Sequence, residues 1–203
     1  GNKVTLTFKP APINHGYVFV RKDLEGEPNI EASAEYVINT KRGTNLEKHG
    51  VFVNTSEHVL AAVVALDIDN IIIEINAPEP PIMDGSSKHF VEALEKAEIE
   101  EQDAERDEFI VKEIISYKDE ETGSEIILMP CDNYQITAMV DFGTKVLGTQ
   151  NATLNSISEF KTEIANARTF SFLHELEMLL DNNLIKGGDL NNAIVYVDKD
   201  ISN

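Results

Sequence analysis

Residues Thr55 to Phe90, TSEHVLAAVVALDIDNIIIEINAPEPPIMDGSSKHF, contain the pattern that decides the fold of this chain. Thr55 is a suitable N-cap for the apolar helix that follows it. The β-branched run from Asn70 to Ile75 predicts a strand. After a Pro-rich loop, a second helix is expected from about Ser86 to Ala97, with Phe90 on its apolar face. This succession of helix, strand and helix predicts a mixed α+β layer.

The residues before this block predict several short strands. Apolar side chains at positions 4, 6 and 8 alternate with polar ones, which is the two-residue period of a half-buried strand. After a break that contains Pro and Gly, Tyr17 to Arg21 predicts a second strand. Two further strands are expected over Glu35–Thr40 and Gly50–Asn54. The first half of the chain therefore combines several strands with two helices.

The acidic, apolar-poor segment at residues 101–108 is the best candidate boundary in the chain. We expect a first domain over residues 1–100 and a second over residues 109–203, each an α+β domain with a sheet and two helices, packed face to face. A capping-box pattern, Ser156-x-x-Glu159, predicts one helix of the second half. The other elements expected there are strands over Phe109–Tyr117, Ser124–Met129, Tyr134–Val140 and Ala193–Val197 and a helix from Phe172 to Leu180.

The charge of the chain excludes one broad class of function. The 203 residues include 42% hydrophobic and 26% charged residues, which is ordinary for a soluble globular protein, but the formal net charge is -19 at pH 7. Because such a surface repels phosphates, we exclude a general nucleic-acid binder. An anionic substrate would need a local cationic pocket, for which Lys186 and Arg168 are the candidates.

Cysteine content and hydropathy indicate the compartment. Cys131 is the single cysteine, so the chain cannot form an internal disulfide, which fits a reducing environment. No apolar run approaches the ~20 residues of a membrane span. The first residues lack the basic and then apolar pattern of a signal peptide. We therefore expect a cytoplasmic protein.

Glu57 and His58 place a carboxylate beside an imidazole at the start of the apolar helix. Neighbouring residues on a helix project about 100° apart, so both side chains reach one cleft if they lie at its edge. A neutral imidazole can bind zinc while an adjacent carboxylate takes a proton from a metal-bound water. The pair is also compatible with the exposed start of a surface helix, because the spacing permits this chemistry without requiring it.

Four stretches of the chain together resemble one family of enzymes. They are TSEHVLAA, NIIIEI and PIMDGS in the first half and ARTF, residues 167–170, in the second. They are similar to the zinc-dependent UDP-3-O-acyl-N-acetylglucosamine deacetylases of bacterial lipid A synthesis, and the similarity extends from Lys3 to about Asp198. The resemblance implies a fold of two α+β domains with the active site between them.

The resemblance also implies roles for particular residues. His58 would be a zinc ligand, and Glu57 would be the general base. Thr169 would stabilise the tetrahedral intermediate, as the donors of an oxyanion hole do. Phe170 would line the substrate site. The substrate implied is UDP-3-O-acyl-N-acetylglucosamine, from which the N-acetyl group is hydrolysed.

Two loops have competing interpretations. Residues 81–87, PIMDGSS, predict a tight turn in which Gly85 adopts a positive φ and a serine caps the next helix. Residues 186–193 are glycine-rich but lack the spacing of a phosphate-binding loop, and they resemble the deacetylase insert that shapes a passage for the fatty-acyl chain. The apolar residues around this insert suit such a passage or an ordinary core. With Phe170, the predicted substrate-binding residues are Leu176, Ile185, Lys186, Gly188, Ala193 and Val195.

The resemblance implies zinc ligands that this sequence does not contain. A catalytic zinc site uses three protein ligands, and the second His and the Asp are expected beyond Asn203. We therefore expect an incomplete second domain and a fragment that is inactive alone. Some members of the family are fused to a hydroxyacyl-carrier-protein dehydratase, which is a further domain to test for in the parent protein.

Two other functions stay open on the sequence alone. A non-catalytic module that binds a sugar nucleotide or an acyl chain would explain the missing zinc ligands. A structural α+β protein would leave Glu57 and His58 facing solvent, away from Thr169.

Overall fold

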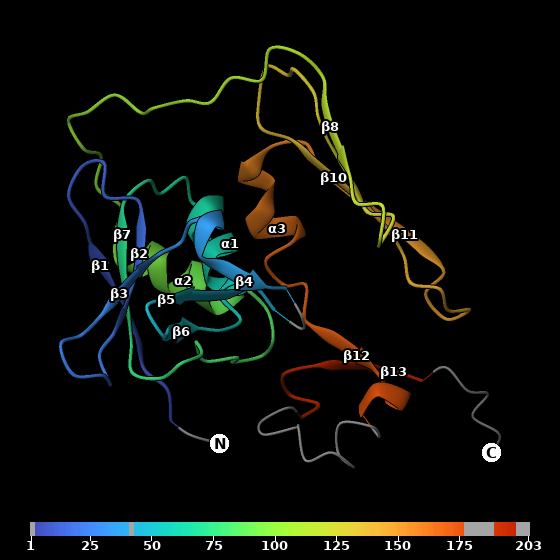
Figure 1. Cartoon of the computed structure of the whole chain (residues 1–203), viewed down its shortest axis with the longest axis horizontal. Coiled ribbons are helices and arrows are strands. Elements are labelled where there is room, and N and C mark those ends of the chain that lie inside the picture. The colour runs from blue at the N-terminus through green and yellow to red at the C-terminus, as the bar shows by residue number, and fades with distance from the viewer. Residues whose placement is uncertain (1–2, 41–42, 177–188, 198–203) are drawn as a thin grey trace.

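A four-stranded sheet organises the first half of the protein (Figure 1). The computed structural model describes residues 3–40, 43–176 and 189–197. The central strand β7 pairs antiparallel with β1 on one side and parallel with β2 on the other, and β3 extends the sheet beyond β2. The strands are β1 (Leu6–Pro10), β2 (Tyr17–Arg21), β3 (Asn29–Glu31) and β7 (Ile71–Ile75).

Helices α1 (Glu57–Ala65) and α2 (Lys88–Lys96) pack together against this sheet. In α2 the buried residues fall at the helical spacing of one apolar stripe, and those of α1 do the same. These stripes meet Phe19 and Ile73, which are fully buried at the centre of the sheet. The first half therefore has one continuous core between its sheet and its two helices, as the alternation of helix and strand predicts.

The start of α1 differs from the prediction. Ser56 is the N-cap residue, whereas Thr55 adopts a φ of 52° and turns the chain into the helix. The Thr55 hydroxyl donates a hydrogen bond to Glu79 Oε1 at 2.6 Å, and the Ser56 hydroxyl donates to the Thr44 carbonyl at 3.0 Å. Both side chains therefore fasten the helix start to neighbouring loops instead of capping it.

A second, three-stranded antiparallel sheet lies beside the first and is formed by β4 (Val37–Asn39), β5 (Asn45–Lys48) and β6 (Val51–Val53). The strand predicted from Glu35 begins later, because residues Ala34–Tyr36 form a 3-10 turn. Strands β3 and β5 were not expected from the sequence, since both are short and carry charged residues. Leu46 and Val53 join the main core, so the small sheet belongs to the same packed unit.

Residues of the predicted acidic linker contact the first half. The Gln102 side chain donates a hydrogen bond to the Ala11 carbonyl at 2.9 Å. Arg106 forms ion pairs with Asp67 at 2.7 Å and with Asp69 at 2.8 Å. These contacts hold the segment along the turn between α1 and β7. The division into residues 1–100 and 109–203 stays a prediction.

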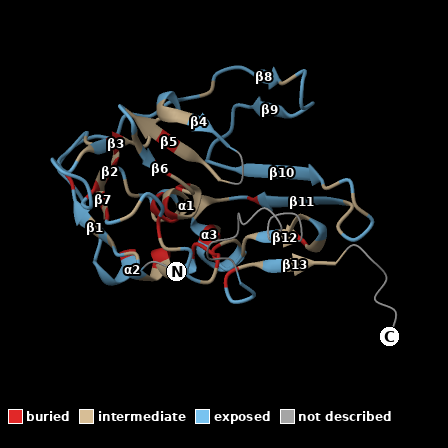
Figure 2. Cartoon of the chain, turned by 60° about the horizontal axis from the view of Figure 1, so that its bottom comes forward, coloured by how far each residue is buried: buried red, intermediate tan, exposed pale blue. Residues whose placement is uncertain are grey.

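The second half contains two antiparallel hairpins whose side chains are largely exposed (Figure 2). Of the residues in their strands, Leu154 is buried, and it reaches the core of the first half together with Phe160 and Ala165. The predicted strand from Phe109 forms only from Ile115 onward. The strands are β8 (Ile115–Lys118), β9 (Glu125–Leu128), β10 (Ile136–Asp141) and β11 (Thr149–Leu154).

The rest of the described second half consists of short elements. Ser156 caps a 3-10 turn over Ile157–Glu159, which leads into the one-turn helix α3 (Phe160–Glu163). Strand β12 (Phe170–Phe172) pairs in parallel with β13 (Ile194–Tyr196). The predicted helix from Phe172 to Leu180 starts one residue later, since Phe172 ends β12, and its part after residue 176 lies outside the described residues. The α+β class is confirmed. In the described ranges, no helix is long and apolar enough to span a membrane.

Candidate functional site

Glu57 and His58 lie at the first turn of α1, where neighbouring loops hold the carboxylate in place. Glu57 Oε2 accepts a hydrogen bond from the Thr44 backbone N–H at 2.7 Å. The other oxygen, Oε1, lies 4.0 Å from His58 Nε2. The Glu57 side chain is 37% exposed and the His58 side chain 22% exposed, so both groups can be reached from solvent. One carboxylate oxygen is therefore fixed, and the other faces the imidazole.

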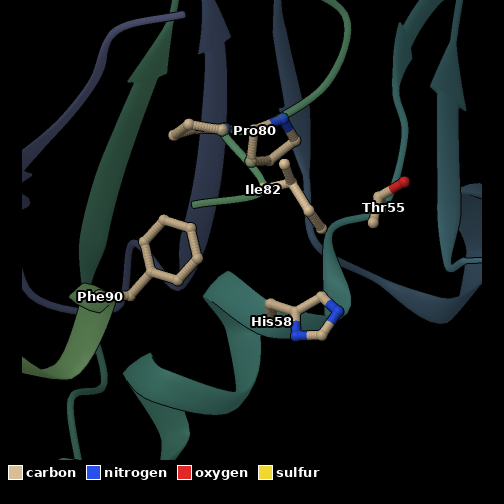
Figure 3. Close-up of a pocket in the computed structure, with 6 residues that line it drawn as sticks. Thr55, His58, Pro80, Ile82 and Phe90 are labelled. Atoms are coloured by element: carbon tan, nitrogen blue, oxygen red, sulfur yellow. The ribbon is translucent and has the colours of Figure 1, made fainter. Parts of the chain in front are cut away.

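His58 also lines a small pocket with a mostly apolar wall (Figure 3). The Pro-rich loop with Pro80 and Ile82 lies across from the helix that carries His58, and Thr55 lies on the segment that leads into this helix. The other lining residues are Pro80, Pro81, Ile82 and Phe90. The geometry thus presents a half-buried imidazole and a carboxylate at the edge of an apolar wall.

The same loop continues from the pocket to Thr169. Gly85 adopts a φ of 84°, which confirms the predicted turn, and its carbonyl accepts the Thr169 N–H at 2.7 Å. The Asp84 carbonyl accepts a hydrogen bond from Arg168 Nε at 2.6 Å. The Thr169 carbonyl in turn accepts the Ile194 N–H at 3.0 Å. Residues 80–85, which we call the proline–glycine loop, therefore connect the His58 pocket with the segment that carries Thr169.

The Asp84 carboxylate fastens the proline–glycine loop to the start of α2. Its Oδ1 accepts hydrogen bonds from the Ser86 N–H at 3.1 Å and the Ser86 hydroxyl at 2.7 Å. Burial acts to raise the pKa of Asp84, but the hydrogen bonds from Ser86 and the charge of nearby His89 outweigh it and lower the pKa below the usual 3.8.

This shift predicts an acid-sensitive loop. A carboxyl group with a lowered pKa stabilises the folded state above its unfolded-state pKa, and the contribution is lost as the pH falls through the folded-state value. We expect the free energy of unfolding to fall below about pH 4 by more in the wild type than in Asp84→Asn. Urea unfolding of both proteins between about pH 3 and pH 6 measures this difference. Identical pH profiles would show that Asp84 contributes nothing to it.

The predicted substrate-binding residues are only partly within the described ranges. Phe170 is 39% exposed and makes edge-to-face contacts with Phe142, Phe172 and Tyr196, at centroid distances of 5.3, 6.0 and 5.7 Å. Leu176, Ala193 and Val195 are half-buried. Ile185, Lys186 and Gly188 lie outside the described residues. The passage for an acyl chain therefore stays a prediction, with an aromatic cluster at its Phe170 end.

The described residues do not by themselves fit a catalytic zinc centre. Such a centre takes three protein ligands and leaves one position open. Among the residues described, no group of three His, Cys, Asp or Glu side chains is placed to hold a metal ion. His58 with Glu57 offers one imidazole and one carboxylate, and the latter is already bonded to Thr44.

The structure places two of the predicted site residues side by side and connects them with the third through one loop. Glu57 and His58 share the helix start, and the proline–glycine loop is their link to Thr169. Sequence reasoning missed the Thr44 N–H that holds Glu57 and the contact between Arg168 and the Asp84 carbonyl. The glycine in the loop indicates a turn, but backbone partners more than eighty residues away leave no local signal.

Comparisons with known proteins agree on one family. The whole chain, residues 1–203, matches the family described as UDP-3-O-acyl N-acetylglycosamine deacetylase. A bifunctional enzyme LpxC/FabZ of Bacteroides thetaiotaomicron is 48% identical over 202 residues, covering 100% of this chain and 44% of that protein. UDP-3-O-acyl-N-acetylglucosamine deacetylases of Myxococcus xanthus and Chromohalobacter salexigens are 40% and 42% identical, with 100% of this chain and 64% and 67% of those proteins covered. The chain therefore spans less than half of the first relative and about two thirds of the other two.

Proposed function

Because this chain belongs to the UDP-3-O-acyl-N-acetylglycosamine deacetylase family, we propose that its protein hydrolyses the N-acetyl group of UDP-3-O-acyl-N-acetylglucosamine in lipid A synthesis. The identity of 40% to deacetylases across the full chain supports the reaction. The same comparisons do not favour a non-catalytic binding module.

We assign two chemical roles to residues of this chain. Glu57 takes a proton from the water whose oxygen adds to the acetamide carbonyl carbon. Thr169 lies beside the oxygen that becomes negative and stabilises the tetrahedral intermediate. The carbon–nitrogen bond then breaks, the nitrogen takes up a proton, and acetate leaves the free amine on the sugar.

One observation carries this assignment. The Glu57 carboxylate is held by the Thr44 N–H through one oxygen, while its other oxygen lies 4.0 Å from His58 at the edge of the pocket. A general base must be oriented and still have a free lone pair to take a proton. The carboxylate of Glu57 meets both requirements.

We assign one zinc ligand to this chain. The family resemblance implies a zinc ion, and we propose His58 as one of its protein ligands, since a half-buried imidazole at a pocket edge is a suitable donor. A zinc ion, when bound, supplies a Lewis acid for the carbonyl. The described residues do not make a complete zinc site, so the roles above rest on Glu57 and Thr169 alone.

The direct test uses the full-length protein and UDP-3-O-acyl-N-acetylglucosamine. We expect acetate and the free amine to appear in equal amounts, measured by mass spectrometry of the sugar nucleotide. The matched control is the same nucleotide sugar without the 3-O-acyl chain, for which we expect slower turnover. Binding of the substrate without any release of acetate would contradict the proposal and favour a binding module.

We propose two further properties of the full-length protein. The relatives that join LpxC to FabZ support a fused hydroxyacyl-carrier-protein dehydratase, because this chain covers only 44% of the bifunctional enzyme of Bacteroides thetaiotaomicron. The cytoplasm is the proposed compartment, since Cys131 is exposed and free. The size of the native polypeptide on an immunoblot of the cytosolic fraction tests both.

A further inference from the structure

Three backbone segments meet where the proline–glycine loop reaches the second half. The loop contributes residues 84–85, the segment before β12 contributes Arg168 and Thr169, and the turn before β13 contributes residues 189–192. Arg168 joins all three, because its Nε donates to the Asp84 carbonyl at 2.6 Å and its Nη2 donates to the Leu190 carbonyl at 3.2 Å. This junction fixes the backbone of Thr169 from both sides.

Thr169 is bonded through its backbone and not through its side chain. Its N–H donates to Gly85 at 2.7 Å, and its carbonyl accepts from Ile194 at 3.0 Å. Within the described part of the chain, its hydroxyl has no hydrogen-bond partner. The junction therefore sets the position of the residue while leaving its hydroxyl available to a substrate.

Gly85 has no room for a side chain at this junction. A Cβ atom there would lie 2.1 Å from the Asn192 carbonyl oxygen and 3.2 Å from Thr169 Cγ2. Its φ of 84° is also one that other residues rarely adopt. The positive φ of the turn favours a glycine at position 85. The close approach of Asn192 excludes a side chain there for a second reason, because the loop packs tightly against the Thr169 segment.

The same end of the loop is also fastened to the start of α2. Asp84 is bonded to Ser86, which is fully buried, and the Ser86 Oγ accepts the Lys88 N–H at 3.2 Å at the start of α2. Upstream, residues 80–82 line the His58 pocket. The loop therefore joins the wall of the His58 pocket at one end to the Thr169 segment at the other.

We propose that Gly85 and Arg168 are positioning residues that set the place of the Thr169 hydroxyl relative to the Glu57–His58 pair. This inference rests on the proposed function, in which Thr169 stabilises the intermediate. A misplacement of about 1 Å in a catalytic group can lower the rate by about 10²-fold. The junction thus acts on the chemical step more than on substrate binding.

The test compares four variants with the wild type in the full-length protein. Arg168→Met removes both donors, Arg168→Lys keeps the charge and a donor group, and Gly85→Ala introduces the Cβ atom. Gly123→Ala is the matched control, because Gly123 has a φ of 73° and no atom within 4 Å of the added Cβ. We expect Gly85→Ala and Arg168→Met to lower kcat by about 10- to 100-fold with little change in KM. Arg168→Lys should recover part of the loss, and Gly123→Ala should leave kcat unchanged.

A double-mutant cycle separates positioning from a general loss of structure. If Arg168 acts through Thr169, Arg168→Met should lower kcat in the wild type but cause little further loss in a Thr169→Ala background. The same fold-loss in both backgrounds, or an unchanged kcat in Arg168→Met, would overturn the inference. Should Gly85→Ala fail to fold, the cycle on Arg168 decides alone. The proposed function fails separately, if the wild type releases no acetate or if Thr169→Ala keeps full turnover.

Discussion

Replacing Glu57 by alanine in the full-length protein should lower kcat for deacetylation by about 10²- to 10⁴-fold, the range of general acid–base catalysis. The carboxylate is oriented by the Thr44 N–H, and its other oxygen lies 4.0 Å from His58 Nε2, so alanine removes the group to which we assign the proton transfer. Steady-state kinetics of acetate release measure the loss.

Two controls define what the Glu57 result means. Glu57→Gln keeps an oxygen that can accept the Thr44 N–H but cannot take a proton, so it should lose about as much activity as Glu57→Ala. Glu47→Ala removes a carboxylate from β5, which we place outside the site, and should retain wild-type turnover. Wild-type turnover in Glu57→Gln would show that the carboxylate only holds the loop around Thr44.

Replacing Phe19 by alanine should reduce the free energy of unfolding by about 3–5 kcal/mol, the usual cost of removing a buried aromatic ring. Phe19 is fully buried on β2, the strand that pairs in parallel with β7 at the centre of the sheet. The cavity would lie between the sheet and helices α1 and α2. Urea unfolding of this chain, followed by circular dichroism, measures the loss.

Phe52→Ala is the matched control for the core. Phe52 is 42% exposed on β6, and its contact with Arg21 uses the backbone carbonyl, which alanine retains. We expect a clearly smaller loss than for Phe19→Ala. Equal losses for the two variants would mean that the sheet does not have the packed core described above.

The sequence predicted the elements that carry their own local pattern. The β-branched run of β7 and the apolar stripe of α2 are examples, because burial against one face imposes a period on the residues. Strand β5 escaped prediction, since its four residues, NLEK, show no β-branched enrichment and are held by pairing with β4 and β6. The N-cap of α1 was wrong by one residue because tertiary bonds from Thr55 and Ser56 override the local capping preference.

The candidate site residues could be named from the sequence, but the contacts that hold them in place could not. Glu57, His58 and Thr169 follow from the motifs that carry the family resemblance, and their catalytic roles stay predictions. The bond between Arg168 and the Asp84 carbonyl joins positions 84 residues apart, and a backbone acceptor has no residue type to mark it. Sequence patterns report which side chains a position needs, whereas the backbone carbonyl that such a side chain meets is decided by the fold.

The separation between Asp84 and Arg168 has a consequence for synthesis on the ribosome. Eighty-four residues must be added after Asp84 before its carbonyl can meet Arg168. At about 5–20 residues per second, that interval is on the order of ten seconds. During it helix α2 is added to the strands and the first helix of this half, while the carbonyls of Asp84 and Gly85 still lack the partners that residues 168–169 provide. Only when residues 168–169 have been synthesised can the Asp84 and Gly85 carbonyls form their hydrogen bonds with Arg168 and Thr169. These bonds then connect the loop to the second half of the chain.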